Sequence, residues 1–448
     1  MAEHAQRRKY AVIGTGSRGE MYVRAALGSH ADVADVVAFV DTNPTRMRYY
    51  DEVVSEVDPS HAPVPHYAPD EFDAMIQAQS PEGLIITTPD YIHARYIVRG
   101  LELGLHVVVE KPLTIDPASA RAINEAAQTS SGSVTMTFNY RYSPRNTLMK
   151  QLITDGEIGR PTSVHFEWLL DTGHGADYFR RWHRDKTNSG GLFVHKAAHH
   201  FDLVNWWIDA VPQRVYARGG LKFYGQDNAR DRGQAELPAR GTHDGPHDPF
   251  ELDLREDPRL ESLYLQAEQH DGYHRDQSVF GPGITTEDNL TALVDYSTGV
   301  TLTYALHAHG PWEGYRVAVN GTRGRAELEV IERAQVIPRG QEAVLDPSAV
   351  EDTTADQGVR SRGERLVVQK HFEAAREVEI PQGSGGHGGG DALMLRDIFE
   401  GVREDPWGQV SDHGDGLRAI AVGIGGNHSL ETGQPVDLPT LMGVDLRS

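Results

Sequence analysis

Residues 9–19 read KYAVIGTGSRG, a short apolar run followed at once by three glycines in GxGxxG spacing. In this motif the first glycine, here Gly14, permits a tight turn, and Gly16 lets the backbone approach a pyrophosphate closely. Gly19 lets the following helix pack against the strand. The free N–H groups at the start of that helix, together with its dipole, favour phosphate. The stretch therefore predicts the opening strand, turn and helix of a dinucleotide-binding domain.

An acidic residue follows at the distance that suits a ribose. Residues 36–40 (VVAFV) form the next apolar run, and Asp41 closes it, about 20 residues after the last glycine. A carboxylate there accepts hydrogen bonds from ribose hydroxyls and repels a 2′-phosphate, so NAD is favoured over NADP as the cofactor. Arg46 nearby weakens that preference without reversing it.

The composition limits the classes of partner. The chain has 448 residues, enough for two or three domains. Its formal net charge of −22 argues against nucleic acid and anionic membrane as partners. Because it contains no cysteine, disulfides, thiolate metal sites and cysteine nucleophiles are excluded. No apolar stretch is long enough to span a bilayer, and no apolar signal segment follows Arg7-Arg8. We therefore expect a cytoplasmic protein.

The first third of the chain alternates between predicted strands and helices. Further buried strands are expected at 83–87, 107–109 and 134–138, and helices at 92–103 and 117–128. This alternation implies a doubly wound parallel sheet with right-handed crossovers. The predicted fold class is therefore α/β, with a Rossmann domain over residues 1–138.

The pattern changes from residue 139 onward. Helices are expected at 145–154 and 191–208, and strands at 163–170, 215–219, 291–296, 300–306, 316–320 and 325–330. Short glycine-containing turns join several of these strands, which makes neighbouring strands antiparallel. We expect residues 139–448 to form an α+β domain with a large, mostly antiparallel sheet.

Two polar stretches interrupt this second domain. Residues 224–286 are rich in Asp, Gly and His, with one helix expected around 259–269. Residues 332–387 read as irregular, and helices follow at 391–402 and 415–432. Long loops inside a compact domain are usually lids, oligomer contacts or disordered segments. We treat 224–286 as an insertion whose role the sequence leaves open, a cover over the substrate pocket being one of these alternatives.

Chemistry-bearing residues follow two of the predicted parallel strands. Glu110-Lys111-Pro112 comes directly after the strand at 107–109, and Thr88-Pro89-Asp90, with His93, takes the equivalent place after the preceding strand. Ligands of an open α/β sheet lie beyond the carboxyl ends of its strands, so Lys111 is expected beside the cofactor.

A second cluster lies on the helix expected at 191–208. His195, His199 and Asp202 recur at i, i+4 and i+7 and would share one face of a helix, with Lys196 next to the first histidine. A secondary alcohol releases hydride only as its hydroxyl proton leaves, so a base poised near neutral pH is needed, and histidine fits. A nearby lysine cation would stabilise the developing alkoxide.

Taken together, these segments resemble the glucose–fructose oxidoreductase/inositol dehydrogenase family (Gfo/Idh/MocA). The matching pieces lie in the first half of the chain: Gly14–Gly19, Asp41, Thr88-Pro89-Asp90 with His93, Glu110-Lys111-Pro112, Asn139-Tyr140-Arg141 and the Gly190-Gly191…His199…Asp202 segment. The resemblance implies an NAD(P)-binding Rossmann domain, a second domain whose sheet mediates oligomers, and oxidation or reduction of sugars, cyclitols or their derivatives. Its motif lysine and motif histidine correspond to Lys111 and His199.

The resemblance and the motifs give two sets of expected contacts. The cofactor is expected to touch Gly14, Gly16, Ser17, Arg18, Gly19, Asp41, Thr42, Arg46, Thr88, Pro89, His93, Glu110, Lys111 and Asn139. The substrate is expected to touch Lys111, Tyr140, Arg141, Trp182, His195, Lys196 and His199. Lys111, His199 and His195 are the expected catalytic residues.

The chain departs from the family pattern at one of these positions. Many sugar and inositol dehydrogenases of the family have an aspartate four residues before the motif histidine, where this chain has His195. The family's usual proton network is therefore altered, and so is the expected role of His199. A divalent metal held by His195, His199 and Asp202 is a rival interpretation, although no glutamate follows the first histidine as in zinc proteases. We expect no metal.

The sequence leaves three candidate functions open. The leading hypothesis is an NAD-dependent dehydrogenase that acts on a secondary hydroxyl of a sugar, cyclitol or glycoside, in a homo-oligomer of two or four chains. In this hypothesis His199 takes the hydroxyl proton, and Lys111 orients the oxygen and stabilises its negative charge. The altered His195-Lys196 pair and the insertion motivate a second, a glycosidase that oxidises, eliminates and re-reduces with a recycled NAD. The third is a non-catalytic sugar sensor, which retention of Lys111 and His199 disfavours.

Overall fold

The computed structural model describes residues 7–234, 237–245, 248–336, 347, 359–381, 386–402 and 404–447. The first part of the described chain forms a six-stranded sheet in the order β3-β2-β1-β4-β5-β6, with every pair parallel. Its strands are β1 (Arg8–Ile13), β2 (Ala34–Val40), β3 (His66–Tyr67), β4 (Gly83–Ile86), β5 (His106–Val109) and β6 (Ser133–Met136). This is the Rossmann order, which reverses direction between β1 and β4 and opens a crevice at their carboxyl ends.

Five helices from the first part of the described chain flank this sheet. They are α1 (Gly19–Arg24), α2 (Pro44–Val57), α3 (Phe72–Gln79), α4 (His93–Glu102) and α5 (Pro117–Thr129). The α2 helix begins where the Asn43 side chain accepts hydrogen bonds from the N–H groups of Thr45 and Arg46, an ordinary N-cap. The predicted α/β class and Rossmann domain are confirmed.

The second sheet is a mixed one of nine described strands in the order β14-β13-β12-β11-β7-β10-β9-β8-β15. The strands are β7 (Pro161–Asp171), β8 (Pro212–Gly220), β9 (Asn289–Tyr296), β10 (Thr301–Gly310), β11 (Glu313–Gly321), β12 (Gly324–Arg333), β13 (Gly363–Lys370), β14 (Arg376–Val378) and β15 (Val436–Asp437). The pair β7–β10 is parallel, and the other described neighbours are antiparallel. The prediction of a large, mostly antiparallel sheet is confirmed.

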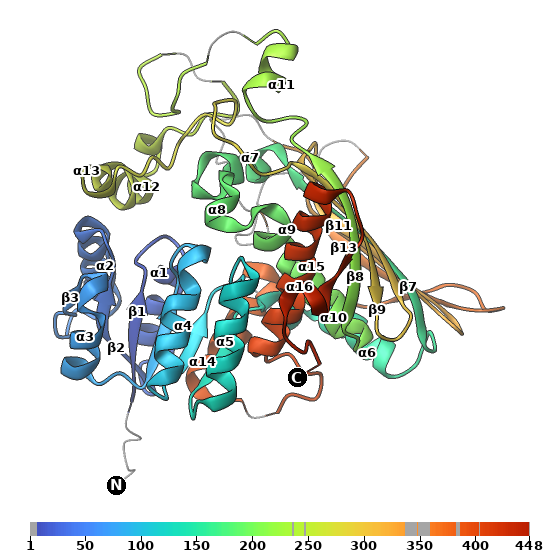
Figure 1. Cartoon of the computed structure of the whole chain (residues 1–448), viewed down its shortest axis with the longest axis horizontal. Helices are drawn as coiled ribbons and strands as arrows, with labels where there is room; N and C mark the ends of the chain where they lie inside the picture. The colour runs from blue at the N-terminus through green and yellow to red at the C-terminus, as the bar shows by residue number, and fades with distance from the viewer. Residues whose placement is uncertain are drawn as a thin grey trace.

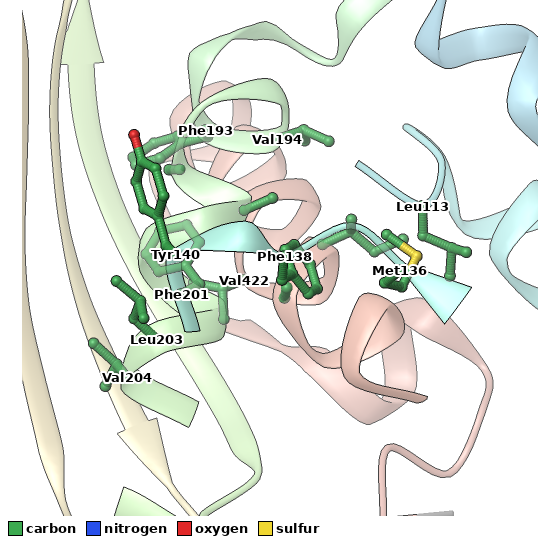
Figure 2. Packing of buried hydrophobic residues seen from close by; sticks show 14 of the residues in the cluster. Leu113, Met136, Phe138, Tyr140, Phe193, Val194, Phe201, Leu203, Val204 and Val422 are labelled. Atoms are coloured by element: carbon green, nitrogen blue, oxygen red, sulfur yellow. The ribbon is translucent and has the colours of Figure 1, made fainter. Parts of the chain in front are cut away.

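Helices fill the space between the two sheets, as Figure 1 shows. They are α6 (Pro144–Thr154), α9 (Gly191–His195), α10 (Ala197–Ile208) and α15 (His413–Thr432). Apolar side chains of both domains meet there, among them Met136 and Phe138 from the first and Phe193 and Val422 from the second (Figure 2). A Cβ added to Gly423 of α15 would lie 2.4 Å from the Phe193 carbonyl oxygen, so α15 needs glycine there. One apolar core therefore joins the domains.

A late helix returns to the first domain. The α14 helix (Gly390–Glu400) places Phe399 edge-on against Tyr10 of β1, with ring centroids 5.4 Å apart. Met394, Leu395 and Ile398 of the same helix are buried in the cluster that Tyr10 belongs to. The first sheet is thus completed by a segment from near the end of the chain.

Three sequence expectations need correction. The helix expected at 191–208 is interrupted at Lys196, whose side chain is buried against Trp168 and Tyr140. The stretch expected to be irregular contains β13 and β14, near an edge of the sheet where one face is exposed, so the apolar alternation is weak. The insertion holds α11 (Gln226–Asp231), α12 (Pro258–Leu263) and α13 (Glu268–Asp271) rather than a single helix.

Candidate active site

A cavity of about 1000 Å³ runs from the glycine-rich turn to the helices α7 (Thr172–Arg180) and α9. Its size lies at the upper end of small-molecule sites, which span about 300–1,000 Å³. Most of the predicted site residues line it: Gly14, Gly16, Ser17, Arg18, Asp41, Thr42, Arg46, Thr88, Pro89, Glu110, Lys111, Asn139, Tyr140, Trp182, His195, Lys196 and His199. Gly19, His93 and Arg141 do not.

The glycine-rich turn has the geometry that its sequence predicts. Gly14 has a φ of +95°, and a Cβ there would lie 2.8 Å from the backbone of Thr87. Gly19 lies behind the turn, where a Cβ would come within 2.7 Å of the Tyr50 hydroxyl. Asp41 accepts hydrogen bonds from the Thr15 N–H at 2.7 Å and the Asn43 N–H at 2.8 Å. The turn and the acid are therefore fixed relative to each other.

Two buried polar atoms on the cavity wall fit a bound dinucleotide. The Thr88 hydroxyl and the Asn139 side-chain carbonyl oxygen have no hydrogen-bond partner among the described residues. The Asn139 amide nitrogen donates to Asp391 at 2.7 Å, which fixes the orientation of its oxygen. Buried polar atoms are normally paired, so atoms of this kind on a cavity wall indicate a ligand. With the phosphate-binding turn and Asp41, the cavity suits an adenine dinucleotide.

Glu110 is held by groups of the first domain. Its carboxylate accepts a hydrogen bond from the Arg18 guanidinium at 2.6 Å and one from the Tyr22 hydroxyl at 2.7 Å. Burial raises the pKa of Glu110, but the Arg18 charge and these hydrogen bonds outweigh it and hold the pKa below its usual range. Glu110 is therefore a fixed negative charge next to Lys111.

Lys111, His195 and Asp90 form a hydrogen-bonded line at the carboxyl ends of β4 and β5. The Lys111 Nζ lies 3.2 Å from His195 Nε2, and it also donates to the His195 carbonyl oxygen at 3.2 Å. His195 Nδ1 lies 2.6 Å from Asp90 Oδ2. Asp90 comes from the first domain and His195 from the second, so the line crosses the domain boundary.

Burial favours the uncharged form of all three groups. It raises the pKa of Asp90 well above its usual range, and the Glu110 charge adds to this while Lys111 opposes it. Burial, with the Lys111 charge, lowers the pKa of His195 well below 6.5. Burial likewise lowers the pKa of Lys111 to about 8, although Asp90 and Glu110 oppose the shift. A lysine of this kind exchanges protons near neutral pH.

The expected motif histidine, His199, also lines the cavity. Its ring stacks on Tyr140 with centroids 4.4 Å apart and meets Phe138 edge-on. The Lys196 ammonium donates to the Tyr140 hydroxyl at 3.3 Å and lies 5.0 Å from the centre of the Trp168 ring. The sequence placed His199 beside Lys111, whereas the structure brings His195 into contact with that lysine.

Arg141 and His93 lie away from the cavity, contrary to expectation. The Arg141 guanidinium donates to both carboxylate oxygens of the buried Asp202, at 2.9 and 2.6 Å, and lies 3.0 Å from Asp415. The His93 ring is buried between the carbonyl oxygens of Pro112 and Thr88. Both motifs lie next to residues that line the cavity, but the spacing of a motif does not reveal the direction in which a side chain points. Arg141 and His93 therefore hold the loops together, and Asp202 is no longer a candidate metal ligand.

The α7 segment supplies a wall that the sequence did not reveal. His174, Tyr178 and His183 line the cavity together with Trp182, which stacks on His183 with centroids 3.6 Å apart. His174 Nδ1 lies 2.6 Å from the buried Glu313, and its Nε2 lies 3.3 Å from the Tyr178 hydroxyl. The RRWH run at 180–183 was the available signal, and it pointed to Trp182 alone.

The insertion covers the phosphate-binding turn. Figure 1 shows α12 and α13 above α2 of the first domain. Arg259 donates to the Ser17 carbonyl oxygen at 3.0 Å and to Glu20 at 2.7 Å. The Ser17 N–H donates to the Tyr264 hydroxyl at 3.0 Å. A cover over the substrate pocket is one of the roles that the sequence leaves open, and the described part of the segment reaches the cofactor-binding turn.

The described part of the chain contains no group of three or more His, Cys, Asp or Glu side chains placed to hold a metal ion. Within the same residues, no helix combines the length and apolar character needed to cross a bilayer.

Comparison with known families matches both domains. The chain matches the description "Oxidoreductase family, NAD-binding Rossmann fold" over residues 8–138. It matches "Oxidoreductase family, C-terminal alpha/beta domain" over residues 150–438. Both are parts of the Gfo/Idh/MocA family, so the matches agree with the motifs at the turn and at Lys111.

Individual relatives agree with the family match. The chain is 33% identical over 443 residues to the Bacillus subtilis protein named "Putative oxidoreductase YteT", across 96% of this chain and 97% of that one. It is 26% identical over 218 residues to inositol 2-dehydrogenase of Rhizobium meliloti, across 48% of this chain and 58% of that enzyme. The WlbA dehydrogenase of Bordetella pertussis, solved with NADH and UDP-GlcNAcA, has a TM-score of 0.61 at 15% identity, over 97% of this chain and 99% of that one.

Proposed function

Because the chain belongs to the Gfo/Idh/MocA family of oxidoreductases, whose N-terminal domain is an NAD-binding Rossmann fold, we propose that it is an NAD-dependent dehydrogenase. It acts on a secondary hydroxyl of a sugar, cyclitol or glycoside. The observation that carries this proposal is the line of Lys111, His195 and Asp90 beside the cofactor cavity. The inositol 2-dehydrogenase relative supports the substrate class.

The proton steps belong to residues of the chain. When bound, NAD accepts hydride from the substrate carbon or returns it. Lys111, with a pKa of about 8, takes the hydroxyl proton in its neutral form and holds the oxygen by a hydrogen bond. When Asp90 is in its carboxylate form, His195 offers a path for that proton toward it, because the three groups are already joined. The buried side chains of α7 line this end of the cavity and would limit the access of water to it.

His195, rather than His199, is the histidine that we assign to proton transfer. Its ring contacts Lys111 directly, whereas the His199 ring faces Tyr140. We assign His199, Tyr140 and Trp182, which all line the cavity, to the substrate wall. His195→Gln is expected to lower kcat more than His199→Gln does. If His199→Gln lowered kcat more than His195→Gln did, the motif histidine His199 would be the base instead.

A substrate panel tests the reaction, and a lysine variant tests the site. Polyols, sugars and glycosides are offered with NAD or NADP, and turnover is followed by NADH absorbance and product analysis. Lys111→Met is expected to lower kcat by about 10²- to 10⁴-fold, the range for a lost general acid or base, while the Kd for NAD stays unchanged. Lys370→Met, on an exposed ion pair of β13, is the control. Equal loss of turnover and NAD binding in Lys111→Met would contradict the assignment.

One observation favours a second candidate, the glycosidase that recycles NAD. Arg259 and Tyr264 of the insertion bond directly to Ser17 of the phosphate-binding turn, a placement that would slow cofactor exchange. A recycled cofactor needs no exchange between turnovers. Cleavage of a chromogenic glycoside by desalted protein, without added NAD and without net NADH, would favour this candidate over the simple dehydrogenase.

We also propose a homo-oligomer, as the family resemblance implies.

A further inference from the structure

Asp271 of the insertion lies at the edge of the cavity where Asp41 is expected to bind the ribose. Its carboxylate is 2.7 Å from the Arg46 guanidinium, and it accepts a hydrogen bond from the Asn43 amide at 3.0 Å. The same Asn43 amide donates to the Ala267 carbonyl oxygen at 3.0 Å. Asp41, Arg46 and Asp271 all line the cavity. A carboxylate more than 200 positions away in sequence thus joins the edge that distinguishes NAD from NADP.

Arg46 is the residue that could otherwise accept a 2′-phosphate. An arginine near the acidic residue after β2 is the usual partner of that group in NADP-binding folds. Here its guanidinium is buried, pairs with Asp271, and lies within 5.8 Å of the ring centres of Tyr264 and Tyr273. Its distance to Asp41 is longer, 3.9 Å. Arg46 is therefore held by the insertion rather than by the Rossmann acid.

The charges at this edge leave a net repulsion toward phosphate. Among these three groups, the carboxylates of Asp41 and Asp271 face one guanidinium, so the trio carries one net negative charge. A 2′-phosphate would have to approach that excess charge and compete with Asp271 for Arg46. The 2′-hydroxyl of NAD is uncharged and would donate a hydrogen bond to Asp41. It is therefore not repelled by the excess charge and does not compete with Asp271 for Arg46. Without Asp271 the excess disappears and Arg46 is released.

From this geometry we infer that Asp271 determines cofactor specificity, excluding NADP by engaging Arg46. The sequence alone placed both the preference for NAD and its weakening by Arg46 in the first domain. The structure adds a residue from the second domain that removes that weakening. The inference rests on the NAD-binding fold and on no particular substrate, so it stands or falls separately from the proposed reaction.

Direct binding measurements on the full-length protein test this inference. The Kd values for NAD and NADP are measured by titration calorimetry for the parent protein, Asp271→Asn and Asp271→Ser. Loss of one nearby charge, together with the release of Arg46, is expected to tighten NADP binding by about tenfold or more. Binding of NAD is expected to change by less than about threefold. Asp271→Asn keeps the shape of the side chain, and Asp271→Ser repeats the test without an amide.

Two further variants make the result specific. Asp244→Asn removes an equally negative side chain from the same insertion, but Asp244 is 96% exposed and pairs with Arg255 outside the cavity. Its NADP affinity should match the parent. Adding Arg46→Ala to Asp271→Asn should abolish the gain in NADP affinity. The inference is overturned if Asp271→Asn and Asp271→Ser both leave the ratio of the two Kd values unchanged, tighten both cofactors equally, or keep the gain without Arg46.

Discussion

At the scale of single residues, Lys111 decides the pH dependence of the proposed reaction. Its pKa is lowered to about 8 by burial, so the neutral form that accepts a proton accumulates as the pH rises through this value. We expect kcat/KM for alcohol oxidation to rise with pH and to level off above about pH 9. For ketone reduction, which needs the protonated lysine, kcat/KM should fall over the same range.

Initial rates between pH 6 and 10 in both directions measure this dependence. Lys111→Arg is the matched variant, because arginine stays charged over the whole range. Its residual activity should lack the inflection. An oxidation profile of the parent protein that is flat between pH 7 and 9 would remove Lys111 from the proton step.

Arg141 makes a different prediction, about stability. Its guanidinium forms a buried pair with Asp202, and removal of one partner of such a pair costs about 3–5 kcal/mol. Arg141→Ala should therefore lower the free energy of unfolding by about that amount, with little change of KM in the folded protein. Urea denaturation measures the difference. Arg99→Ala, in an exposed pair with Asp73, should cost at most about 1 kcal/mol.

At the scale of elements, the insertion should control release of the cofactor. Arg259 on α12 joins the insertion to Ser17 and Glu20, so Arg259→Ala loosens its cover over the phosphate-binding turn. We expect NADH to dissociate about tenfold faster or more, since each charged hydrogen bond is worth about 1.5–3 kcal/mol and every 1.4 kcal/mol is about a factor of ten. Stopped-flow displacement of NADH gives the rate. Arg230→Ala on α11, an exposed pair in the same insertion, should leave it unchanged.

Prediction from sequence succeeded where structure is local. The turn at Gly14, the acid at Asp41 and the lysine after β5 each follow a strand within a few residues, and strand order then fixes their positions. The contact between Asp90 and His195 could not be predicted in this way, because 105 residues separate them and they belong to different domains. Arg141 shows a different error, a predicted substrate contact that the structure does not contain. Its motif gave its position, but the buried Asp202 determined its direction.

The same limit applies to whole elements. The insertion is polar and lacks periodicity, so its sequence reveals neither α13 nor the contact of Asp271 with Arg46. The strand β13 has just two fully buried side chains, Leu366 and Val368, too few for an alternating pattern to stand out. Elements whose apolar face is narrow are recognised only when their partner is known.

At the scale of the molecule, the nine-stranded sheet has an outer face that the described helices leave uncovered, on the side away from the first domain (Figure 1). A hollow of about 450 Å³ crosses this face and is lined by apolar and charged side chains, including Val367, Arg316 and Glu327. We expect homo-oligomers that use this face, measured as mass by light scattering at micromolar concentration. Arg316→Glu should favour monomers and Arg230→Glu should not. A monomeric parent protein would contradict the expectation.

The return of α14 to β1 affects how this protein comes into being. The ribosome makes β1 long before α14, yet Phe399 of α14 packs edge-on against Tyr10 of β1. Until α14 has been synthesised, the apolar side of the first sheet that α14 later covers stays exposed to solvent. Chaperone attachment during synthesis, and aggregation of prematurely terminated chains, are natural results of that delay.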